Sequence, residues 1–228
     1  MKTINDQIND VLESAGMRPL DEGYSNGFDI KVFSEIDSFK ERIAYCNEYL
    51  QKLGTGSSRI AYKIDNDRVL KIAKNQKGIA QNNAEIYGGL DMYPEIFAQI
   101  YDADYQNDMW IEMELATRAR EQDFKDFFGM PSKEVFGVIG EIFAYTMNTQ
   151  NRHKTENSER LYQELVVDEG SSWFYSMSMF IMDFSPKYIE DLYRFANWGV
   201  VMRDGSKHLV IIDNGLSDDV ARQYYGAK

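Results

Sequence analysis

Residues 54–75 read GTGSSRIAYKIDNDRVLKIAKN. The runs RIAYKI and RVLKIA are rich in strand-forming residues and flank Asp65-Asn66-Asp67, so they predict an antiparallel hairpin. Gly54-Thr55-Gly56-Ser57-Ser58 lies where an earlier strand would turn into this hairpin. Glycine lets the backbone approach a ligand closely, so the N–H groups of this turn could bind phosphate oxygens. A glycine-rich hairpin without a ligand is the commoner structure, and the segment alone is a weak signal.

A lysine interrupts the second apolar run. Lys71 lies in VLKIA, and Glu85 follows 14 residues later within an expected helix over residues 77–88. A strand lysine that faces a cleft and is held by a helix carboxylate grips nucleotide phosphates in kinases. A surface ion pair is the alternative, but the position after a glycine turn favours the phosphate-binding interpretation.

The rest of the first half predicts a strand-rich lobe preceded by helices. EIFAQIYDAD and DMWIEMEL form a second expected strand pair around residues 105–108. Upstream, apolar residues recur at helical spacing over residues 4–12, and again at Ile36, Phe39, Ile43, Cys46 and Leu50. The second series predicts one helix that begins at Ser34 as its N-cap.

The second half is mainly helical by pattern. Helices are expected over residues 132–147 and 171–182, with a further one opening at Pro186. The aromatic and methionine-rich segment WFYSMSMFIMDF is expected to be a core helix, and a hairpin is expected around Arg203-Asp204-Gly205-Ser206. The composition shift near residue 116 divides the chain into a helical extension (1–47), a strand-rich lobe (48–116) and a helical lobe (117–228).

Composition narrows the classes of function. The chain has 25 Lys and Arg against 37 Asp and Glu, a formal net charge of -12 that would repel nucleic acid and anionic membranes. The single cysteine, Cys46, excludes an internal disulfide, and the two histidines, His153 and His208, lack metal-ligand spacing. The N-terminus has no apolar core typical of a signal peptide, and no apolar run reaches about 18 residues. We therefore expect a cytoplasmic protein.

Side chains whose oxygen atoms could bind a metal ion lie near the C-terminus. Asn197 precedes one expected strand and Asp213 ends the next, so both side chains would converge at one end of the hairpin, as a Mg²⁺ site requires. Asp213 as a turn-capping residue is the alternative. Arg194 lies between Asp191 and Asn197, where it could neutralise phosphate charge or pair with a carboxylate.

Five segments in this order are similar to the small protein-kinase-like proteins of tailed bacteriophages. They are GTGSSRIAYKI, RVLKIAKN, KGIAQNNAE, DLYRFANWGVVMRDG and LVIIDNGL, within residues 48–225. The resemblance implies an α+β fold of two lobes, an antiparallel sheet lobe and a truncated helical lobe, with ATP and Mg²⁺ between them.

The resemblance also implies residue roles. Lys71 would contact the α- and β-phosphates, Glu85 would hold Lys71, and Asp191 would orient the acceptor hydroxyl. Asn197 and Asp213 would bind Mg²⁺. The glycine turn would cover the phosphates, and adenine would lie near residues 113–116, which include Met113 and Glu114.

The chain also departs from the protein-kinase pattern. Arg59 stands at the third glycine of G-x-G-x-x-G, the His-Arg-Asp triplet is missing, and Asp191 precedes Asn197 by six positions instead of five. The metal motif reads Asp213-Asn214-Gly215 instead of Asp-Phe-Gly. An Ala-Pro-Glu segment does not follow Asp213, which makes a conventional peptide substrate doubtful.

Several functions fit these residues. An ATP- and Mg²⁺-dependent phosphotransferase with an unknown acceptor, which could be a host protein, is the leading hypothesis. A pseudokinase that binds nucleotide or docks to a host or phage protein is the first alternative. Nucleotidyl (AMP) transfer is the second, and a structural protein that makes contact through its N-terminal helices is the third.

Overall fold

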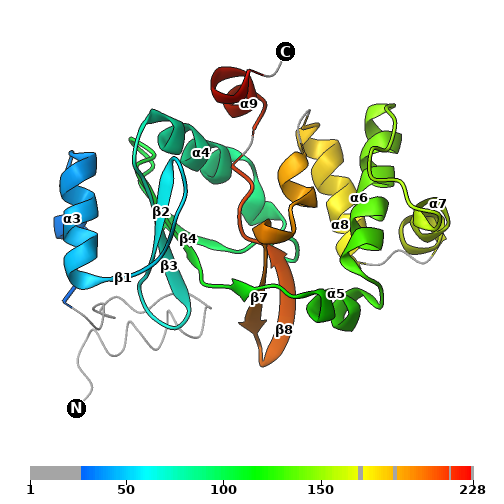
Figure 1. The fold of residues 1–228 in the computed structure, drawn as a ribbon, viewed down its shortest axis with the longest axis horizontal. Helices are drawn as coiled ribbons and strands as arrows, with labels where there is room; N and C mark the ends of the chain where they lie inside the picture. Colours follow the sequence, from blue (N-terminus) through cyan, green and yellow to red (C-terminus); the bar gives the residue numbers. More distant parts are fainter. Residues whose placement is uncertain (1–26, 169–171, 187–188, 216, 227–228) are drawn as a thin grey trace.

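The computed structural model describes residues 27–168, 172–186, 189–215 and 217–226. The helix expected over residues 4–12 lies outside these ranges. Strands dominate the first half of the described chain and helices dominate the second (Figure 1). The α+β class and the layout of a sheet lobe beside a helical lobe agree with the prediction.

The sheet lobe is built on five antiparallel strands in the order β1-β2-β3-β5-β4. The strands are β1 (Gln51–Thr55), β2 (Arg59–Lys63), β3 (Arg68–Ala73), β4 (Ile100–Ala103) and β5 (Trp110–Glu114). Both hairpins predicted in this lobe are confirmed. The glycine turn joins β1 to β2, as predicted.

Side chains point alternately to the two sides of each strand, so the sheet has two different faces. On β3, Leu70 and Ile72 pack with Phe33 and Cys46 on the outer face, the one covered by the N-terminal helices. Lys71 points to the opposite face and lines a cavity. The single lysine in this apolar run therefore lies on the face that the helical lobe approaches.

The N-terminal helices differ from the prediction of one helix starting at Ser34. The structure has α2 (Ile30–Ser34) and α3 (Phe39–Tyr49), and Ser38 caps α3 by accepting a hydrogen bond from the Glu41 N–H. Buried Arg42 donates to the carbonyl groups of Ser34 and Ile36. The prediction was wrong at Ser34 because these carbonyls between the helices bond to Arg42 instead of continuing a helical ladder.

Helix α4 (Gln76–Tyr87) follows β3 and packs on β3 and β5. Asn75 caps it by accepting from the Gly78 N–H at 3.1 Å. A Cβ atom at Gly78 would lie 2.3 Å from the Ser58 carbonyl oxygen, so glycine is required for the close approach of α4 to the glycine turn.

Between residues 121 and 197, the described part of the helical lobe forms helices and short 3-10 turns. These are α5 (Glu121–Phe128), α6 (Ser132–Met147), α7 (Ser158–Tyr162), α8 (Ser172–Phe184), η3 (Glu190–Tyr193) and η4 (Phe195–Asn197), with a π-helical turn (Gln163–Asp168) after α7. The helices predicted for α6 and α8 are confirmed, whereas the described residues after Pro186 form η3 instead of an α-helix.

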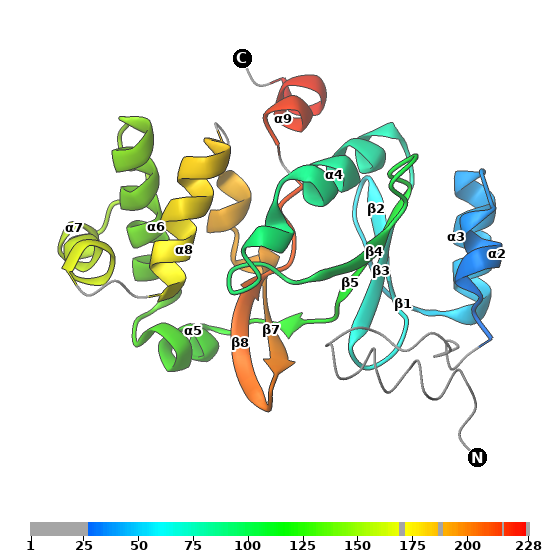
Figure 2. The same cartoon turned by 180° about the vertical axis from the view of Figure 1, so that it is seen from behind.

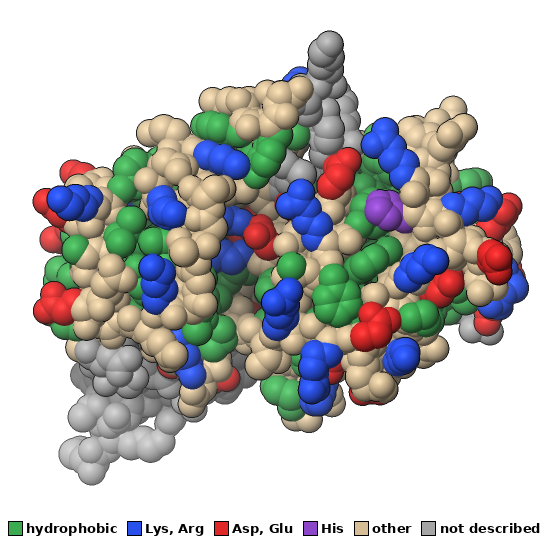
Figure 3. Space-filling view, in the orientation of Figure 1, with side chains coloured by type: hydrophobic (Ala, Val, Ile, Leu, Met, Phe, Trp, Pro, Cys, Tyr) green, Lys and Arg blue, Asp and Glu red, His purple; other side chains and the backbone are tan. Residues whose placement is uncertain are grey.

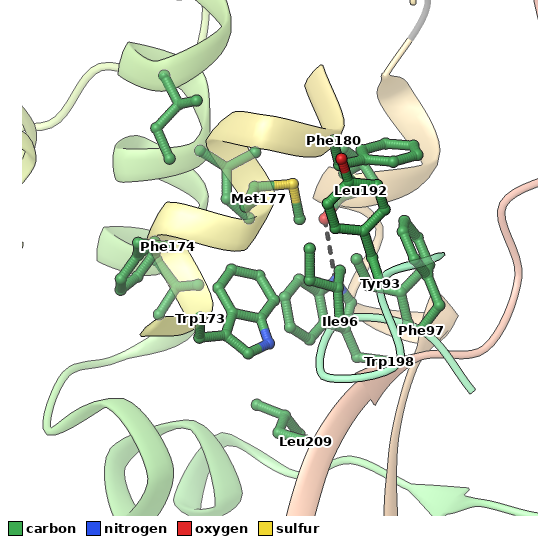
Figure 4. Close-up of a cluster of buried hydrophobic side chains, with 14 of the residues drawn as sticks. Tyr93, Ile96, Phe97, Trp173, Phe174, Met177, Phe180, Leu192, Trp198 and Leu209 are labelled. Carbon is green, nitrogen blue, oxygen red and sulfur yellow. Dashed lines mark hydrogen bonds between the residues drawn. The ribbon is translucent and has the colours of Figure 1, made fainter. Parts of the chain in front are cut away.

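The core of the helical lobe is aromatic. The expected core helix α8 contributes Trp173, Phe174, Met177 and Phe180, which pack around Trp198 (Figure 4). The Trp198 indole N–H donates to the Leu192 carbonyl at 2.9 Å, which ties the start of β7 to η3. Core packing therefore holds the two short turns that carry Asp191, an expected catalytic residue, and Asn197, an expected metal ligand.

A second sheet lies between the lobes. It has the order β6-β7-β8, with strands β6 (Thr117–Arg118), β7 (Trp198–Arg203) and β8 (Ser206–Ile211). Figure 2 shows β7 and β8 between the five-stranded sheet and the helices α5 to α8. The β7–β8 hairpin is confirmed, and its turn has Asp204 and Gly205 at positive φ, the conformation that Asp-Gly turns favour.

Contacts between the lobes fix their relative position. The Ala98 N–H donates to the Ile211 carbonyl at 3.0 Å, and the Ile211 N–H donates to the Ile96 carbonyl at 2.8 Å. Helix α9 (Asp218–Tyr225) then crosses to α4 above the sheet lobe (Figure 1). Among the residues described, none of the helices is long and apolar enough to span a membrane.

Candidate functional site

A cavity of about 340 Å³ opens between the glycine turn and the loops of the helical lobe. Lys71 lines its sheet side, and Asp191, Arg194, Asn197 and Asp213 line the opposite side. Figure 3 shows a hollow between the two halves of the molecule in which basic and acidic side chains lie together. Residues predicted from distant segments of the sequence therefore meet at one place.

The glycine turn forms one wall of the cavity. Gly54, Gly56, Ser57 and Ser58 line it, whereas Thr55 is not among the lining residues. The Lys74 ammonium group donates to the Gly56 carbonyl at 2.8 Å and to the Thr55 hydroxyl at 3.3 Å. Lys74 thus holds the turn against the end of β3.

An ion pair between Lys71 and Glu85 lies at the edge of the cavity. Lys71 Nζ lies 3.0 Å and 3.3 Å from the two carboxylate oxygens of Glu85 and donates to the Ile212 carbonyl at 2.6 Å. Glu85 is almost fully buried. Burial of a carboxylate is costly unless it is paired, so the pair holds the Lys71 ammonium group in a fixed position at the cavity edge.

Arg59 joins this ion pair to the helical lobe. Its guanidinium Nη1 lies 2.9 Å from Glu85 Oε1, and Nη2 lies 2.5 Å from Asp213 Oδ1. Burial alone would raise the pKa of Asp213, but Arg59 and Lys71 outweigh it and lower that pKa to about 2. Asp213 is therefore ionised at neutral pH. Its carboxylate lines the cavity and also pairs with Arg59.

The two 3-10 turns place the remaining polar residues. Asp191 is buried in η3, with its carboxylate 3.6 Å from Arg194 Nη1. The Asn197 side-chain amide donates to the Asp191 carbonyl at 3.2 Å, and the Asn197 carbonyl accepts from the Ile212 N–H at 2.7 Å. These bonds link Asp191 and Asn197 to the segment that carries Asp213.

The oxygen donors suit a magnesium ion in type. Asn197 and Asp213 line the same cavity and offer a carboxamide and a carboxylate, the hard oxygen ligands that Mg²⁺ takes in proteins. A group of three or more His, Cys, Asp and Glu side chains arranged for a metal is not found in the described part of the chain. Arg59 already contacts one oxygen of Asp213, so a bound ion would share this carboxylate with a guanidinium.

Two residues predicted to contact adenine are not brought to this cavity. Met113 is buried in β5, and the Glu114 carboxylate accepts from Arg203 and from the Gln99 backbone N–H. The next backbone N–H, that of Leu115, donates to the Asp67 carbonyl at 2.7 Å.

The cavity also contains residues that sequence reasoning missed. Gln81 accepts a hydrogen bond from the Ser58 hydroxyl, and Tyr225 reaches the cavity from α9, with its ring 3.9 Å from Lys77 Nζ. Gln81 could have been found, because it lies one helical turn before Glu85. Tyr225 has no such signal, since only the fold brings α9 beside α4.

The chain was compared with known proteins. No protein-family model and no curated protein matches it. Solved structures do: the GDP and kanamycin complex of APH(2")-IIIa has a TM-score of 0.39 and 14% identity, covering 75% of this chain and 68% of that one. The GDP complex of aminoglycoside 2'-phosphotransferase-IIIa has a TM-score of 0.37 and 14% identity, covering 79% and 73%.

SAICAR synthase from Saccharomyces cerevisiae, in complex with SAICAR, is also similar, with a TM-score of 0.34 and 9% identity over 81% of this chain and 76% of that one. All three TM-scores are below 0.5. The side chains that meet in the cavity are therefore the basis for assigning a function.

Proposed function

We propose that the cavity binds ATP and that the chain is a kinase-like phosphotransferase. The observation that carries this proposal is the convergence on one cavity of the Lys71–Glu85 ion pair with Asp191, Asn197 and Asp213 from the other lobe. Phosphoryl transfer depends on positioning and on neutralisation of charge, and these residue types supply both.

Each residue has a role in this proposal. The glycine turn covers the phosphates, and Lys71, held by Glu85, binds them with its ammonium group. Asp191 orients an acceptor hydroxyl and takes its proton, while the acceptor oxygen bonds to the γ-phosphorus, the bond from that phosphorus to the β–γ bridging oxygen breaks, and ADP leaves.

Arg194 stabilises the charge that develops on the transferred group. Asn197 and Asp213 would hold Mg²⁺, which when bound supplies positive charge to the phosphate oxygens.

The adenine site is proposed near the strand end that carries Met113 and Glu114. Met113 belongs to a buried apolar cluster with residues from both lobes, including Val69 and Val210. Ligand sites are lined mainly by apolar side chains, and an adenine ring would need such a lining. Because neither predicted side chain lines the polar cavity, the base would lie beyond it, towards the residues that connect the lobes.

Thermal unfolding with and without ATP and Mg²⁺ tests binding. A ligand at about 100 times its Kd stabilises the folded state by about 2.7 kcal/mol, which is a shift of several degrees in Tm. Lys71→Met should lose the shift. Lys63→Met is the matched control, because Lys63 lies on the same sheet and bonds to Asn66, away from the cavity. A folded wild-type protein without any shift would refute the proposal.

Labelled ATP then separates the reactions. Transfer of label from γ-labelled ATP to an acceptor, with none from α-labelled ATP, is the result expected for a phosphotransferase. The reverse pattern would identify nucleotidyl transfer instead. Binding without transfer of either label would favour a pseudokinase, an alternative supported by the contact between Arg59 and Asp213.

We further propose that the chain belongs with the small protein-kinase-like proteins of tailed bacteriophages. The sequence segments that carry this resemblance also carry the cavity, which supports the proposal. The lobes would then span residues 48–116 and 117–228, and the acceptor would be a host or phage protein in the host cytoplasm. Incubation of host extract with the protein and γ-labelled ATP, followed by mass spectrometry, would identify that acceptor.

A further inference from the structure

Arg59 occupies an unusual place for a charged side chain. It stands at the third glycine position of the predicted glycine-rich pattern, yet its side chain is only 9% exposed. Its guanidinium pairs with Glu85 at 2.9 Å and with Asp213 at 2.5 Å, and it lies 3.4 Å from Asn82 Oδ1. The departure from the pattern thus places a fixed cation inside the site.

The backbone and the neighbours of Arg59 hold its side chain in place. The Gly56 N–H donates to the Arg59 carbonyl at 2.9 Å, so its backbone closes the glycine turn. A Cβ atom at Gly215 would lie 3.1 Å from Arg59 Nη2, a tight contact. The backbone of Arg59 also pairs with Ala73 of β3. Together these contacts hold the guanidinium in place before a ligand binds, which lowers the entropy cost of binding.

The charge balance of the site depends on Arg59. Among the described residues, ion pairs at the cavity join the carboxylates Glu85, Asp191 and Asp213 to the cations Lys71, Arg194 and Arg59. These ion pairs contain three carboxylates and three cations. Without Arg59 the carboxylates would be in excess, and the phosphates of a nucleotide would be repelled unless another cation entered with them.

A divalent ion ordinarily supplies that positive charge at carboxylate-rich phosphate sites. Here the guanidinium already lies on the carboxylate that the ion would use. Arginine is always charged and binds phosphate or carboxylate oxygens through a planar fork, so it can serve as a permanent substitute for part of the metal charge.

We propose that Arg59 is a resident cation of the phosphate site, which neutralises Asp213 and Glu85 and lets nucleotide phosphates bind without a divalent ion. This rests on the proposed function, because it takes the cavity to be the ATP site. A metal would then be needed for transfer but not for binding. Arg59 is a positioning residue for Glu85 and Asp213 and a direct source of positive potential for the phosphates.

Equilibrium binding of a fluorescent ATP analogue tests this, once in excess EDTA and once in excess MgCl₂. For the wild-type protein the two Kd values should agree within about threefold, because Arg59 already supplies positive charge to the phosphates. A threefold difference in Kd is less than half of the about 1.4 kcal/mol that a factor of ten represents. Arg59→Gln should weaken binding in EDTA by about tenfold or more, and MgCl₂ should restore part of the loss. Arg59→Lys, which keeps the charge, should fall between the two.

Arg68→Gln is the matched control. Arg68 is also buried on the same sheet and pairs with Asp65 and Glu112, but it does not line the cavity. Its variant should bind the analogue as the wild-type protein does in both solutions. Thermal unfolding of each variant verifies that it is folded before its Kd is interpreted.

The outcomes separate the two proposals. Wild-type binding that requires MgCl₂, with Arg59→Gln equal to wild type, would overturn the role of Arg59 and leave the ATP site standing. A folded wild-type protein that binds in neither solution would overturn both. If neither Arg59 variant folds, the wild-type comparison decides alone: similar Kd values support the inference, and binding only with MgCl₂ refutes it.

Discussion

Two buried arginines on neighbouring strands show how differently the two faces of the sheet are used. Arg68 lies 2.5 Å from Asp65 and 3.2 Å from Glu112, and Arg59 lies at similar distances from Asp213 and Glu85. Each arginine pairs with one buried glutamate, Glu85 or Glu112, and with one partly exposed aspartate. The difference is that Asp213 lines the cavity, whereas Asp65 does not. The Arg59 network therefore keeps one charged group open to the cavity.

The rest of each face follows the same division. Apart from the ion pair between Arg68 and Glu112, the outer face is apolar and is covered by α2 and α3, so its residues serve the fold. The opposite face carries Lys71 and meets loops of the helical lobe across a cavity. Changes on the outer face should cost stability, and changes at the cavity should cost binding or transfer.

The largest expected effect is on stability, at the outer face. Phe33 is fully buried against Phe28 and Trp110, so Phe33→Ala should lower the free energy of unfolding by about 3–5 kcal/mol. Urea unfolding measures it. Val32→Ala, at an exposed position of the same helix, should change it by less than about 1 kcal/mol. Equal effects would show that the outer face is not a packed core.

The next effect is on transfer, at the cavity. Asp213→Asn keeps the shape of the side chain but removes its charge, so the rate of phosphoryl transfer should fall by about 100-fold or more, equivalent to about 2.7 kcal/mol. Labelled ATP measures the rate, and Asp219→Asn on the exposed surface of α9 is the control. A variant with full activity would remove Asp213 from the mechanism.

A smaller effect is expected on the pH dependence of the free energy of unfolding. The pKa of Asp213 is about 2 in the folded protein against an ordinary value of 3.8, because Arg59 and Lys71 outweigh the effect of burial. The ionised group thus stabilises the fold fully above about pH 4, and this stability is lost as the pH falls towards about 2. Urea unfolding at several pH values should show Asp213→Asn less stable than wild type at pH 5, with the difference shrinking in acid. A constant difference would contradict the ion pair.

The smallest effect concerns Cys46, on the outer face. Burial raises the pKa of its thiol to about 12, so the reactive thiolate is scarce at neutral pH. A maleimide reagent should therefore label the native protein slowly and the urea-unfolded protein at once. Mass spectrometry follows the reaction. Rapid labelling of the native protein would mean that α3 is not packed on the sheet.

Local patterns were enough to predict most of the elements. The turns at residues 65–67 and 203–206 and the helix Ser132–Met147 follow from turn chemistry and apolar periodicity, which act within a few residues. The break between α2 and α3 could not be predicted this way. It depends on Arg42, a buried residue of α3 that donates to the carbonyls of Ser34 and Ile36 at the end of α2.

The site was predictable where a residue type stands out from its surroundings. Lys71 in an apolar strand and Asp213 at a strand end are such residues, and both line the cavity. The role of Arg59 was not predictable, because its partner Asp213 lies 154 positions away and only the folded chain brings them together. Sequence patterns report local surroundings, whereas ion pairs between lobes depend on the tertiary structure.

The most direct test of the central claim is a crystal structure of the protein with a non-hydrolysable ATP analogue. We expect the triphosphate between the glycine turn and Asp213, with a phosphate oxygen within hydrogen-bond distance of Lys71 Nζ. A nucleotide bound elsewhere on the molecule, or one in the cavity whose phosphates do not contact Lys71, would contradict it.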